Sequence, residues 1–293
     1  MGPVEPTVEI VRQLPSLSAR RADSHKGDFG RVLVVAGSRG MAGAAILSGS
    51  AALRGGAGIV RLAVPHEILP TVAAGNPCYM TVPLPGDDHG RLGDAARDGL
   101  LELAQAHDVI AVGPGLNRSP VLTALLAVLL AQVSKPVVLD ADGLNAFADH
   151  PERLRQRTAP LILTPHPGEL ARLVHLEIAE VQAKRRELAV GFAREHNVVV
   201  VLKGHGTLVT DGHYLYENNT GNPGMATPGS GDVLTGLVAA LLGQGLAPFA
   251  AAQLGVYLHG LSGDLARADL GEVSLIATDL IAYLPKAFVK HLG

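Results

Sequence analysis

The sequence reads Asn222-Pro-Gly-Met-Ala-Thr-Pro-Gly-Ser-Gly-Asp232 and continues at once as Val233-Leu-Thr-Gly-Leu-Val-Ala-Ala-Leu-Leu242. The first stretch holds too much glycine and proline for regular structure, whereas the second has the composition of a buried helix. We expect Ser230 to be the N-cap, because its hydroxyl can accept a hydrogen bond from a free N–H of the first turn. A glycine-rich loop that enters a helix presents bare N–H groups at the positive end of the helix dipole. The stretch therefore predicts an anion site of the kind that binds phosphate.

Asp232 lies in the first turn of that helix, beside the predicted anion. A carboxylate next to a phosphate costs electrostatic energy unless it has a chemical task. One interpretation is a base that takes a proton from a hydroxyl which attacks, or receives, a phosphoryl group. The other is structural: Asp232 favours a helix N-terminus and the glycines form a turn.

The rest of the chain alternates apolar strands with helical segments. Strands are expected at 31–36, 59–64, 78–82, 108–112, 136–139, 161–163 and 198–202, with a hairpin about Asp211-Gly212. Helices are expected at 7–14, 66–75, 94–106, 119–133 and 181–195, besides the one after Asp232. The alternation predicts an α/β fold with a mostly parallel central sheet and helices on both faces. We expect one domain over 1–293, with 1–23 as an N-terminal extension, and ligands at the carboxyl ends of the strands.

Composition excludes several classes of protein. Of the 293 residues 47% are hydrophobic but only 3% aromatic, so Ala, Val and Leu must build the core. The net charge of −3 provides no basic field for nucleic acid. The one cysteine, Cys78, rules out an internal disulfide, fits a reducing cytoplasmic compartment and is expected to be a small buried hydrophobe. We expect neither a signal peptide nor a membrane span.

Two glycine-containing turns follow predicted strands. Gly37-Ser-Arg-Gly-Met-Ala-Gly-Ala44 follows the first of these strands and Gly113-Pro-Gly115 the fourth. Their glycines allow a ligand to approach the backbone, although tight packing turns would need the same residues. Neither turn has the spacing of a dinucleotide fingerprint.

Asp140-Ala-Asp142 places two carboxylates at the end of another strand. They suit Mg²⁺ bound through water, or a sugar hydroxyl. Alternatively, Asp140 caps the strand and Asp142 caps the next helix.

The turn Thr164-Pro-His166-Pro-Gly-Glu169 is more specific, because its two prolines hold His166 on an extended path. His166 is a candidate hydrogen-bond partner for a substrate. Glu169 is either an organiser of water around Mg²⁺ or a partner of the helix dipole. Three other histidines, His175, His196 and His291, lack such a setting and are expected on the surface.

Lys203-Gly-His-Gly-Thr207 ends the next predicted strand. Lysine and threonine among small residues suit nucleotide phosphates, although the spacing is not that of a P-loop. A β-turn with a solvated lysine is the alternative.

Together these stretches resemble a known family. The motifs are GDFGRVLVVAGS (27–38), DADGLNAF (140–147), LTPHPGEL (163–170), LKGHGT (202–207) and NPGMATPGSGD (222–232). In this order they resemble the NAD(P)H-hydrate dehydratases of the ribokinase-like superfamily, over about Ser24 to Ala268. The resemblance implies a repair enzyme that removes water from (S)-NADHX or (S)-NADPHX and restores NADH or NADPH.

The resemblance also implies a site. Asp232 would be the catalytic base, and the hydrate would contact Ala44, Gly115, His166 and Asp232. The nucleotide would contact Lys203, Gly204, His205, Gly206, Thr207, Gly229, Ser230 and Gly231. Mg²⁺ would accompany the nucleotide, with Glu169 as the candidate residue near it.

Single-domain bacterial members use ADP and leave AMP and phosphate, whereas the eukaryotic relatives use ATP. The family implies a homotetramer. It also implies an NAD(P)HX epimerase, for which this chain is too short and which we expect on a separate chain. Two alternatives stay open. One is a kinase of the same superfamily that acts on a thiazole, pyrimidine or pyridoxal alcohol, and the other is a nucleotide sensor without turnover.

Overall fold

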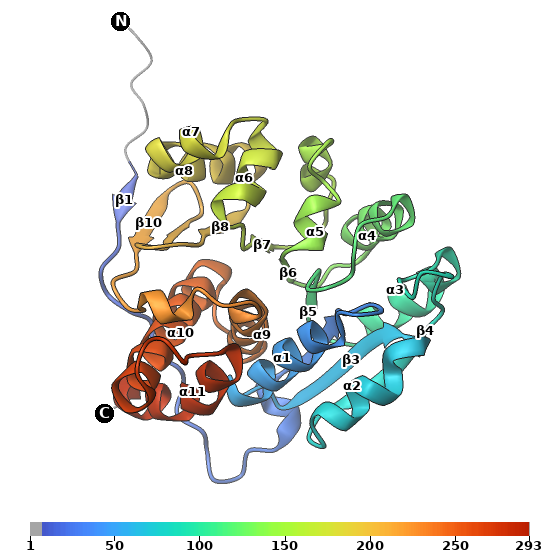
Figure 1. The fold of residues 1–293 in the computed structure, drawn as a ribbon, viewed down its shortest axis with the longest axis horizontal. Helices are drawn as coiled ribbons and strands as arrows, with labels where there is room; N and C mark the ends of the chain where they lie inside the picture. Colours follow the sequence, from blue (N-terminus) through green and yellow to red (C-terminus); the bar gives the residue numbers. More distant parts are fainter. Residues whose placement is uncertain (1–7, 293) are drawn as a thin grey trace, which may run out of the picture.

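A ten-stranded sheet forms the centre of the computed structural model, which describes residues 8–292 (Figure 1). Across the sheet the order is β1-β10-β9-β8-β7-β6-β5-β2-β3-β4. The strands are β1 (Glu9–Ile10), β2 (Arg31–Val35), β3 (Ile59–Pro65), β4 (Met80–Leu84), β5 (Val109–Val112), β6 (Val137–Leu139), β7 (Leu161–Leu163), β8 (Val199–Leu202), β9 (Leu208–Thr210) and β10 (Tyr214–Glu217). Only β9 runs antiparallel to its two neighbours, and every other pair is parallel.

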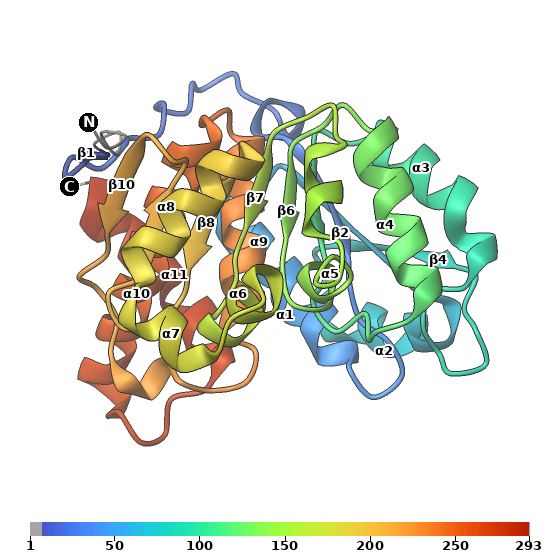
Figure 2. The ribbon, with the colours of Figure 1, turned by 90° about the horizontal axis from the view of Figure 1, so that it is seen from above.

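Helices cover both faces of this sheet (Figure 2). They are α1 (Ala42–Arg54), α2 (Leu69–Gly75), α3 (Arg97–Gln105), α4 (Pro120–Gln132), α5 (Asp142–Asn145), α6 (Pro167–Val174), α7 (Ile178–Ala183), α8 (Arg185–His196), α9 (Ser230–Gly243), α10 (Pro248–Leu270) and α11 (Ala277–Leu292). Short 3-10 turns lie at Lys26–Phe29, His66–Ile68, Asp94–Ala96, Pro151–Arg155 and Pro223–Met225. No helix within residues 8–292 is long and apolar enough to cross a bilayer.

Alternate residues of each strand enter two separate cores. In β2, Val32 and Val34 pack with α1, α2, α9, α10 and α11, whereas Leu33 and Val35 pack with α3 to α8. This two-sided burial explains why the parallel strands read as continuous apolar runs rather than as alternating patterns.

The contact between α1 and α9 depends on a missing side chain. A Cβ atom on Gly236 would overlap the backbone oxygen of Ser48, so glycine allows the two helices to lie close together. This contact fixes the position of α9, the helix that follows the glycine-rich loop.

Most expected elements are present. The hairpin about Asp211-Gly212 is formed by β9 and β10, and β7 has the expected bounds. The helix expected at 119–133 begins as predicted, because Ser119 Oγ accepts the N–H of Leu122 at 3.0 Å.

The expected N-terminal helix at 7–14 is wrong where the structure describes it, and Thr7 lies outside the described residues. Here β1 adds a short strand beside β10, with the Glu9 N–H donating to His213 O at 2.8 Å. Edge pairing with a distant strand therefore outweighs the local helical pattern.

Smaller differences concern the bounds of two elements and the exposure of two side chains. The strand expected from 78 starts at Met80, and the helix expected at 181–195 is two helices with a break at Lys184. Cys78 is exposed rather than buried. His196, expected on the surface, is 4% exposed and stacks on Phe192 at 4.2 Å.

We predict that Gly236→Ala destabilises the fold by about 1–3 kcal/mol, the usual cost of overpacking a close helix contact. Gly191→Ala in α8 is the matched control, because a Cβ there meets nothing within 4 Å. That control should stabilise the fold by about 0.5–1 kcal/mol through helix propensity. Urea unfolding measures both changes, and equal effects of the two substitutions would contradict the packing argument.

Candidate active site

The turns that follow five parallel strands meet at one edge of the sheet. Backbone hydrogen bonds join them: the Gly37 N–H donates to Pro114 O and the Lys203 N–H to Pro165 O, each at 2.8 Å. The glycine-, proline- and acid-containing turns thus converge at the carboxyl ends of the strands, the place where the sequence predicts ligands. The N-terminus of α9 reaches the same edge, where it brings Asp232 and Thr235 close to the turns.

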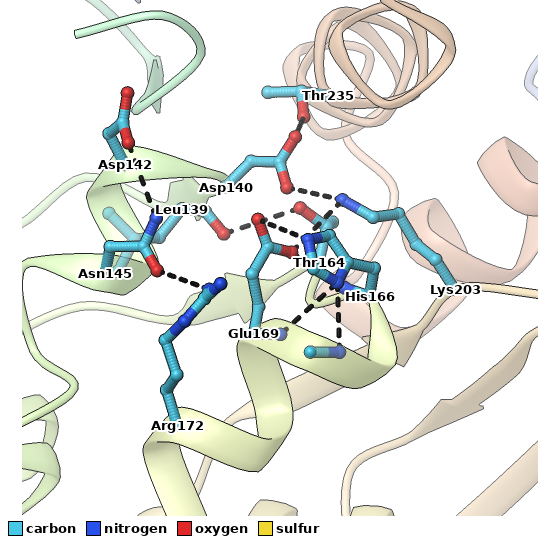
Figure 3. Close-up of polar contacts among 11 residues, drawn as sticks. Leu139, Asp140, Asp142, Asn145, Thr164, His166, Glu169, Arg172, Lys203 and Thr235 are labelled. Atoms are coloured by element: carbon cyan, nitrogen blue, oxygen red, sulfur yellow. Dashed lines mark hydrogen bonds and ion pairs between the residues drawn. The ribbon is translucent and has the colours of Figure 1, made fainter. Parts of the chain in front are cut away.

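Asp140, directly after β6, is the centre of the polar cluster in Figure 3. It is 1% exposed, and its Oδ1 accepts a hydrogen bond from Lys203 Nζ at 2.7 Å. Its Oδ2 accepts from Thr235 Oγ1 of α9, also at 2.7 Å. Asp140 is therefore neither a strand cap nor a free ligand: it ties β6, β8 and α9 together.

Lys203 has a second carboxylate nearby, since its Nζ lies 3.7 Å from Glu169 Oε2. Burial alone would lower the pKa of Lys203, but Asp140 and Glu169 outweigh burial and raise it. Burial raises the pKa of Glu169, and Lys203 opposes that rise. The Lys203 ammonium is thus held charged between two acids, and the interpretation as a solvated lysine is wrong.

His166 is the N-cap of α6. Its Nδ1 accepts the N–H groups of Gly168 at 3.0 Å and Glu169 at 3.3 Å, and Glu169 Oε2 accepts the His166 N–H at 2.7 Å. Burial, followed by Lys203 and Arg172, lowers the pKa of His166. A neutral ring that accepts through Nδ1 carries its proton on Nε2, and the side chain is 50% exposed. His166 therefore caps α6 through Nδ1, while the one donor of its half-exposed ring is Nε2, which lies 3.5 Å from Glu169 Oε1.

The glycine-rich loop that begins at Asn222 passes into α9 one residue earlier than expected. Gly229 is the N-cap, with φ 90°, so the prediction that the Ser230 hydroxyl caps the helix is wrong. Instead the Ser230 carbonyl accepts a hydrogen bond from Nε2 of His259 at 2.9 Å. Burial lowers the pKa of His259 to about 4, so this buried ring is a neutral donor at pH 7.

Asp232 lies in the first turn of α9 and is partly buried. Burial, together with Asp140, raises its pKa to about 7, although Lys203 opposes the rise. No side chain within residues 8–292 forms a hydrogen bond or an ion pair with its carboxylate. The neighbouring Gly231 leaves the space beside Lys203 open, because a Cβ there would lie 3.3 Å from Nζ.

Ala44 and Gly115 also meet at this edge. A Cβ on Gly115 would lie 2.8 Å from the Cβ of Ala44, and Gly115 has a φ of 63°. Asp142 supports this loop, since its Oδ2 accepts the N–H of Asn117 at 2.7 Å. Asp142 is not the cap of α5, whose N-cap Ala141 makes no side-chain hydrogen bond.

The turn at 203–207 depends on two glycines in left-handed conformations, Gly204 at φ 130° and Gly206 at φ 62°. Thr207 Oγ1 donates to Gly204 O at 2.9 Å, and His205 is exposed. Arg185 of α8 donates to the carbonyls of Leu202, Lys203 and Gly206, which fixes the turn.

Sequence reasoning missed three supporting residues, Arg185, Thr235 and His259. Each acts across a large sequence separation, so no local motif marks it. Of the three, only Thr235 lies in a quoted segment, where it reads as one small residue of an apolar helix.

Within residues 8–292 no three His, Cys, Asp or Glu side chains are grouped to hold a metal ion. Glu169 Oε2 already accepts a backbone N–H, and Asp140 is occupied by Lys203 and Thr235. A dedicated protein cage for a metal is therefore not formed by these residues.

The comparisons identify the family. The family model for NAD(P)H-hydrate dehydratase matches residues 32–286. The bifunctional NAD(P)H-hydrate repair enzyme Nnr of Moorella thermoacetica is 48% identical over 92% of this chain and 51% of that protein. The ADP-dependent (S)-NAD(P)H-hydrate dehydratase of Neisseria meningitidis is 41% identical, over 90% of this chain and 85% of that protein.

A solved structure agrees. The ADP/ATP-dependent NAD(P)H-hydrate dehydratase of Bacillus subtilis, co-crystallised with ATP/Mg²⁺, superposes with a TM-score of 0.79. It is 30% identical and covers 94% of each chain. The fold is the ribokinase-like α/β fold that the sequence predicts. The chain spans about half the length of the bifunctional relatives it matches. On the family match over 32–286 and the identity to its relatives, the chain belongs to the NAD(P)H-hydrate dehydratase family.

Proposed function

We propose that this chain dehydrates (S)-NADHX and (S)-NADPHX to NADH and NADPH, with ADP converted to AMP and phosphate. The proposal draws on the relatives named above and on one structural observation. Asp232, whose pKa is raised to about 7, lies beside an anion-binding helix N-terminus and the Lys203 ammonium. A poised base next to a phosphate site is what activation of a hydroxyl by phosphoryl transfer requires.

The reaction then has two stages. Asp232 takes the proton of the ring hydroxyl, whose oxygen attacks the β-phosphorus of ADP, and AMP leaves. The ring nitrogen's electron pair next expels phosphate, and the neighbouring carbon loses a proton to complete the double bond. The N–H groups at the start of α9 and the Lys203 ammonium stabilise the charge on the transferred phosphoryl group.

The nucleotide is proposed to lie over the turn from Lys203 to Thr207 and over Gly229, Ser230 and Gly231. Support comes from the approach of Gly231 to Lys203, which joins these two segments. The left-handed conformations of Gly204 and Gly206 shape this turn, and the lack of side chains lets phosphates or an adenosine approach its backbone.

Mg²⁺ fits this site as an ion that arrives on the nucleotide. Mg²⁺ keeps several waters and binds through one or two carboxylates plus substrate phosphates. Glu169 Oε1 is the oxygen that would accept from a water of that ion, because Oε2 caps α6 and Oε1 is 3.5 Å from His166 Nε2. The ion would supply neutralisation of phosphate charge.

The hydrate is proposed to contact Ala44, Gly115, His166 and Asp232. Ala44 and Gly115 form one small wall, and His166 Nε2 supplies a hydrogen-bond donor. The bifunctional relatives support an NAD(P)HX epimerase as functional partner. A homotetramer in the cytoplasm remains part of the proposal.

One assay separates dehydration from the kinase and sensor alternatives. Purified protein is incubated with chemically prepared NADHX and either ADP or ATP, and NADH absorbance is followed. Dehydration yields NADH and free phosphate in equal amounts. A stable phosphorylated alcohol made from a thiazole, pyrimidine or pyridoxal substrate would indicate a kinase, and binding without turnover would indicate a sensor.

We predict that Asp232→Asn lowers kcat by about 10²–10⁴-fold, the usual contribution of a general base. Above pH 7 the folded protein must hold this carboxylate charged, against a pKa raised from 3.8 to about 7. The raised pKa destabilises the fold there, so the uncharged variant should melt at a higher temperature at pH 8. A variant that keeps more than about a tenth of kcat contradicts the role.

The pH dependence of kcat/KM should rise through an apparent pKa near 7, because only the deprotonated Asp232 accepts a proton. Below that pH the rate should fall about tenfold per unit. The residual rate of Asp232→Asn serves as the control and should lack this limb. A wild-type profile that is flat from pH 5 to 8 would assign the proton transfer elsewhere.

Substitution of His166 separates hydrate binding from helix capping. His166→Asn keeps a side-chain acceptor for the N–H groups of α6 but loses the Nε2 donor of the ring, whereas His166→Ala loses both. A neutral hydrogen bond contributes about 0.5–1.5 kcal/mol, so both variants should raise KM for NADHX by up to about tenfold. Only the alanine variant should lower the melting temperature. Equal loss for NADHX and ADP would remove His166 from the hydrate site.

A further inference from the structure

A hollow opens close to His166, beside the first turns of α6. It has a volume of about 360 Å³ and lies between α6, the start of α7 and the segment after α5 that contains Ala148 and Asp149. Gly168 lines it, and the Gly168 N–H is the one that His166 Nδ1 accepts. The hollow therefore begins two residues from His166, which is a proposed contact of the hydrate.

Basic side chains line this hollow. Arg118, Arg172 and His175 all contribute to it. Within residues 8–292 Arg118 makes no ion pair, and Arg172 donates only to the neutral amide oxygen of Asn145, at 2.9 Å. Arg172 also acts on Glu169 from beyond ion-pair distance and opposes the rise of its pKa that burial causes. Exposed guanidinium groups without a carboxylate in contact are well suited to bind phosphate oxygens through two parallel N–H donors.

Two acids also line the hollow, Asp149 and Glu177. Neither lies within ion-pair distance of the two arginines in the part of the chain that the structure describes. Glu177 is used locally, since its side chain accepts a backbone N–H in the first turn of α7. The arginines thus retain their charge and their donors for a ligand.

The position of Arg172 relative to Lys203 indicates what charge a ligand of the hollow would carry. In Figure 3 the two cations stand on opposite sides of His166 and Glu169. Both act on the same ring, because Lys203 and Arg172 each lower the pKa of His166. Lys203 and the α9 N-terminus are the phosphate site of the proposed function. Arg172 is a second positive group, on the other side of the His166 ring.

The loop that carries Arg118 is held firmly. Arg118 follows Gly115 by three residues, and Asp142 accepts the Asn117 N–H between them at 2.7 Å. Arg91 donates to the Arg118 carbonyl at 2.9 Å. A ligand that contacts Gly115 and His166 with one end therefore has the two arginines within reach of its remainder.

We propose that this hollow binds the phosphate groups of the hydrated dinucleotide, with Arg118 and Arg172 as the residues that hold them. The inference rests on the proposed function, because it assumes that the reacting ring lies at Gly115, His166 and Asp232. The phosphate concerned is either the pyrophosphate bridge, present in both hydrates, or the 2′-phosphate of NADPHX alone. Charge-assisted hydrogen bonds give such a contact both affinity and dependence on salt.

The test measures binding of NADPH and NADH, the stable products that carry the same phosphates, by calorimetry without ADP. Wild type is compared with Arg118→Gln and Arg172→Gln. Arg153→Gln is the control, since Arg153 is exposed in a 3-10 turn and does not line the hollow. Arg118→Gln is the cleaner variant, because the Arg172 guanidinium also bonds Asn145. Melting temperatures check that each variant is folded.

We expect each of the two variants to weaken NADPH binding by about 10–100-fold, the equivalent of about 1.4–2.8 kcal/mol. The control should bind like wild type, and ADP affinity should not change. Equal losses for NADH and NADPH assign the pyrophosphate, and loss for NADPH alone assigns the 2′-phosphate. Wild-type affinity for both dinucleotides in both variants overturns the inference, as does a wild type that binds neither.

The same variants separate this inference from the proposed function. If wild type does not convert NADHX with ADP or ATP, the proposed function fails, while NADPH affinity still decides about the hollow. If conversion is present and the two arginine variants keep wild-type KM for both hydrates, the hollow is not the phosphate site and the proposed function stands.

Discussion

The buried ammonium of Lys203 is the interaction on which the rest of the site depends. It joins Asp140 at the end of β6 to Glu169 at the start of α6, and Asp140 in turn holds Thr235 of α9. Removal of one member of such a group leaves an uncompensated buried charge, which typically costs about 3–5 kcal/mol. The same contacts that stabilise the carboxyl end of the sheet therefore also hold α9 beside it, through Thr235.

In that cluster Lys203, Asp140 and Glu169 have partners of opposite charge close by, whereas a fourth charged group, Asp232, has no such contact among the described residues. Asp140 and Glu169 share the lysine, whereas Asp232 enters the same partly buried region without a hydrogen bond from any described side chain. Its carboxylate is consequently the least stable charge of the site, which is the condition that makes it a good proton acceptor near pH 7. The electrostatic cost of this charge falls on Asp232, the residue to which we assign the chemistry, as expected for a functional site.

The sequence predicts what local rules control. The apolar run at 161–163 located β7, and the Asp211-Gly212 turn located the hairpin of β9 and β10. Glycine and proline marked the turns that converge on the site. Contacts between distant segments left no local trace: Thr235 meets Asp140 across 95 positions, and β1 forms only because β10 offers a free edge. The Ser230 cap was wrong because Gly229 adopts φ 90° and takes the N-cap position itself.

The charge state of His166 links the two sides of the site. Its Nδ1 is used by α6, and Lys203 and Arg172 both disfavour a proton on the ring. An imidazolium here would add a third positive charge between two cations, so the ring stays neutral and offers a single Nε2–H. A neutral donor suits an uncharged hydroxyl or carboxamide, whereas phosphates are better served by the flanking lysine and arginines. Under the proposed function, the arrangement separates an uncharged reacting ring from the anionic groups on either side of it, so that one site orients a nucleotide and a dinucleotide at once.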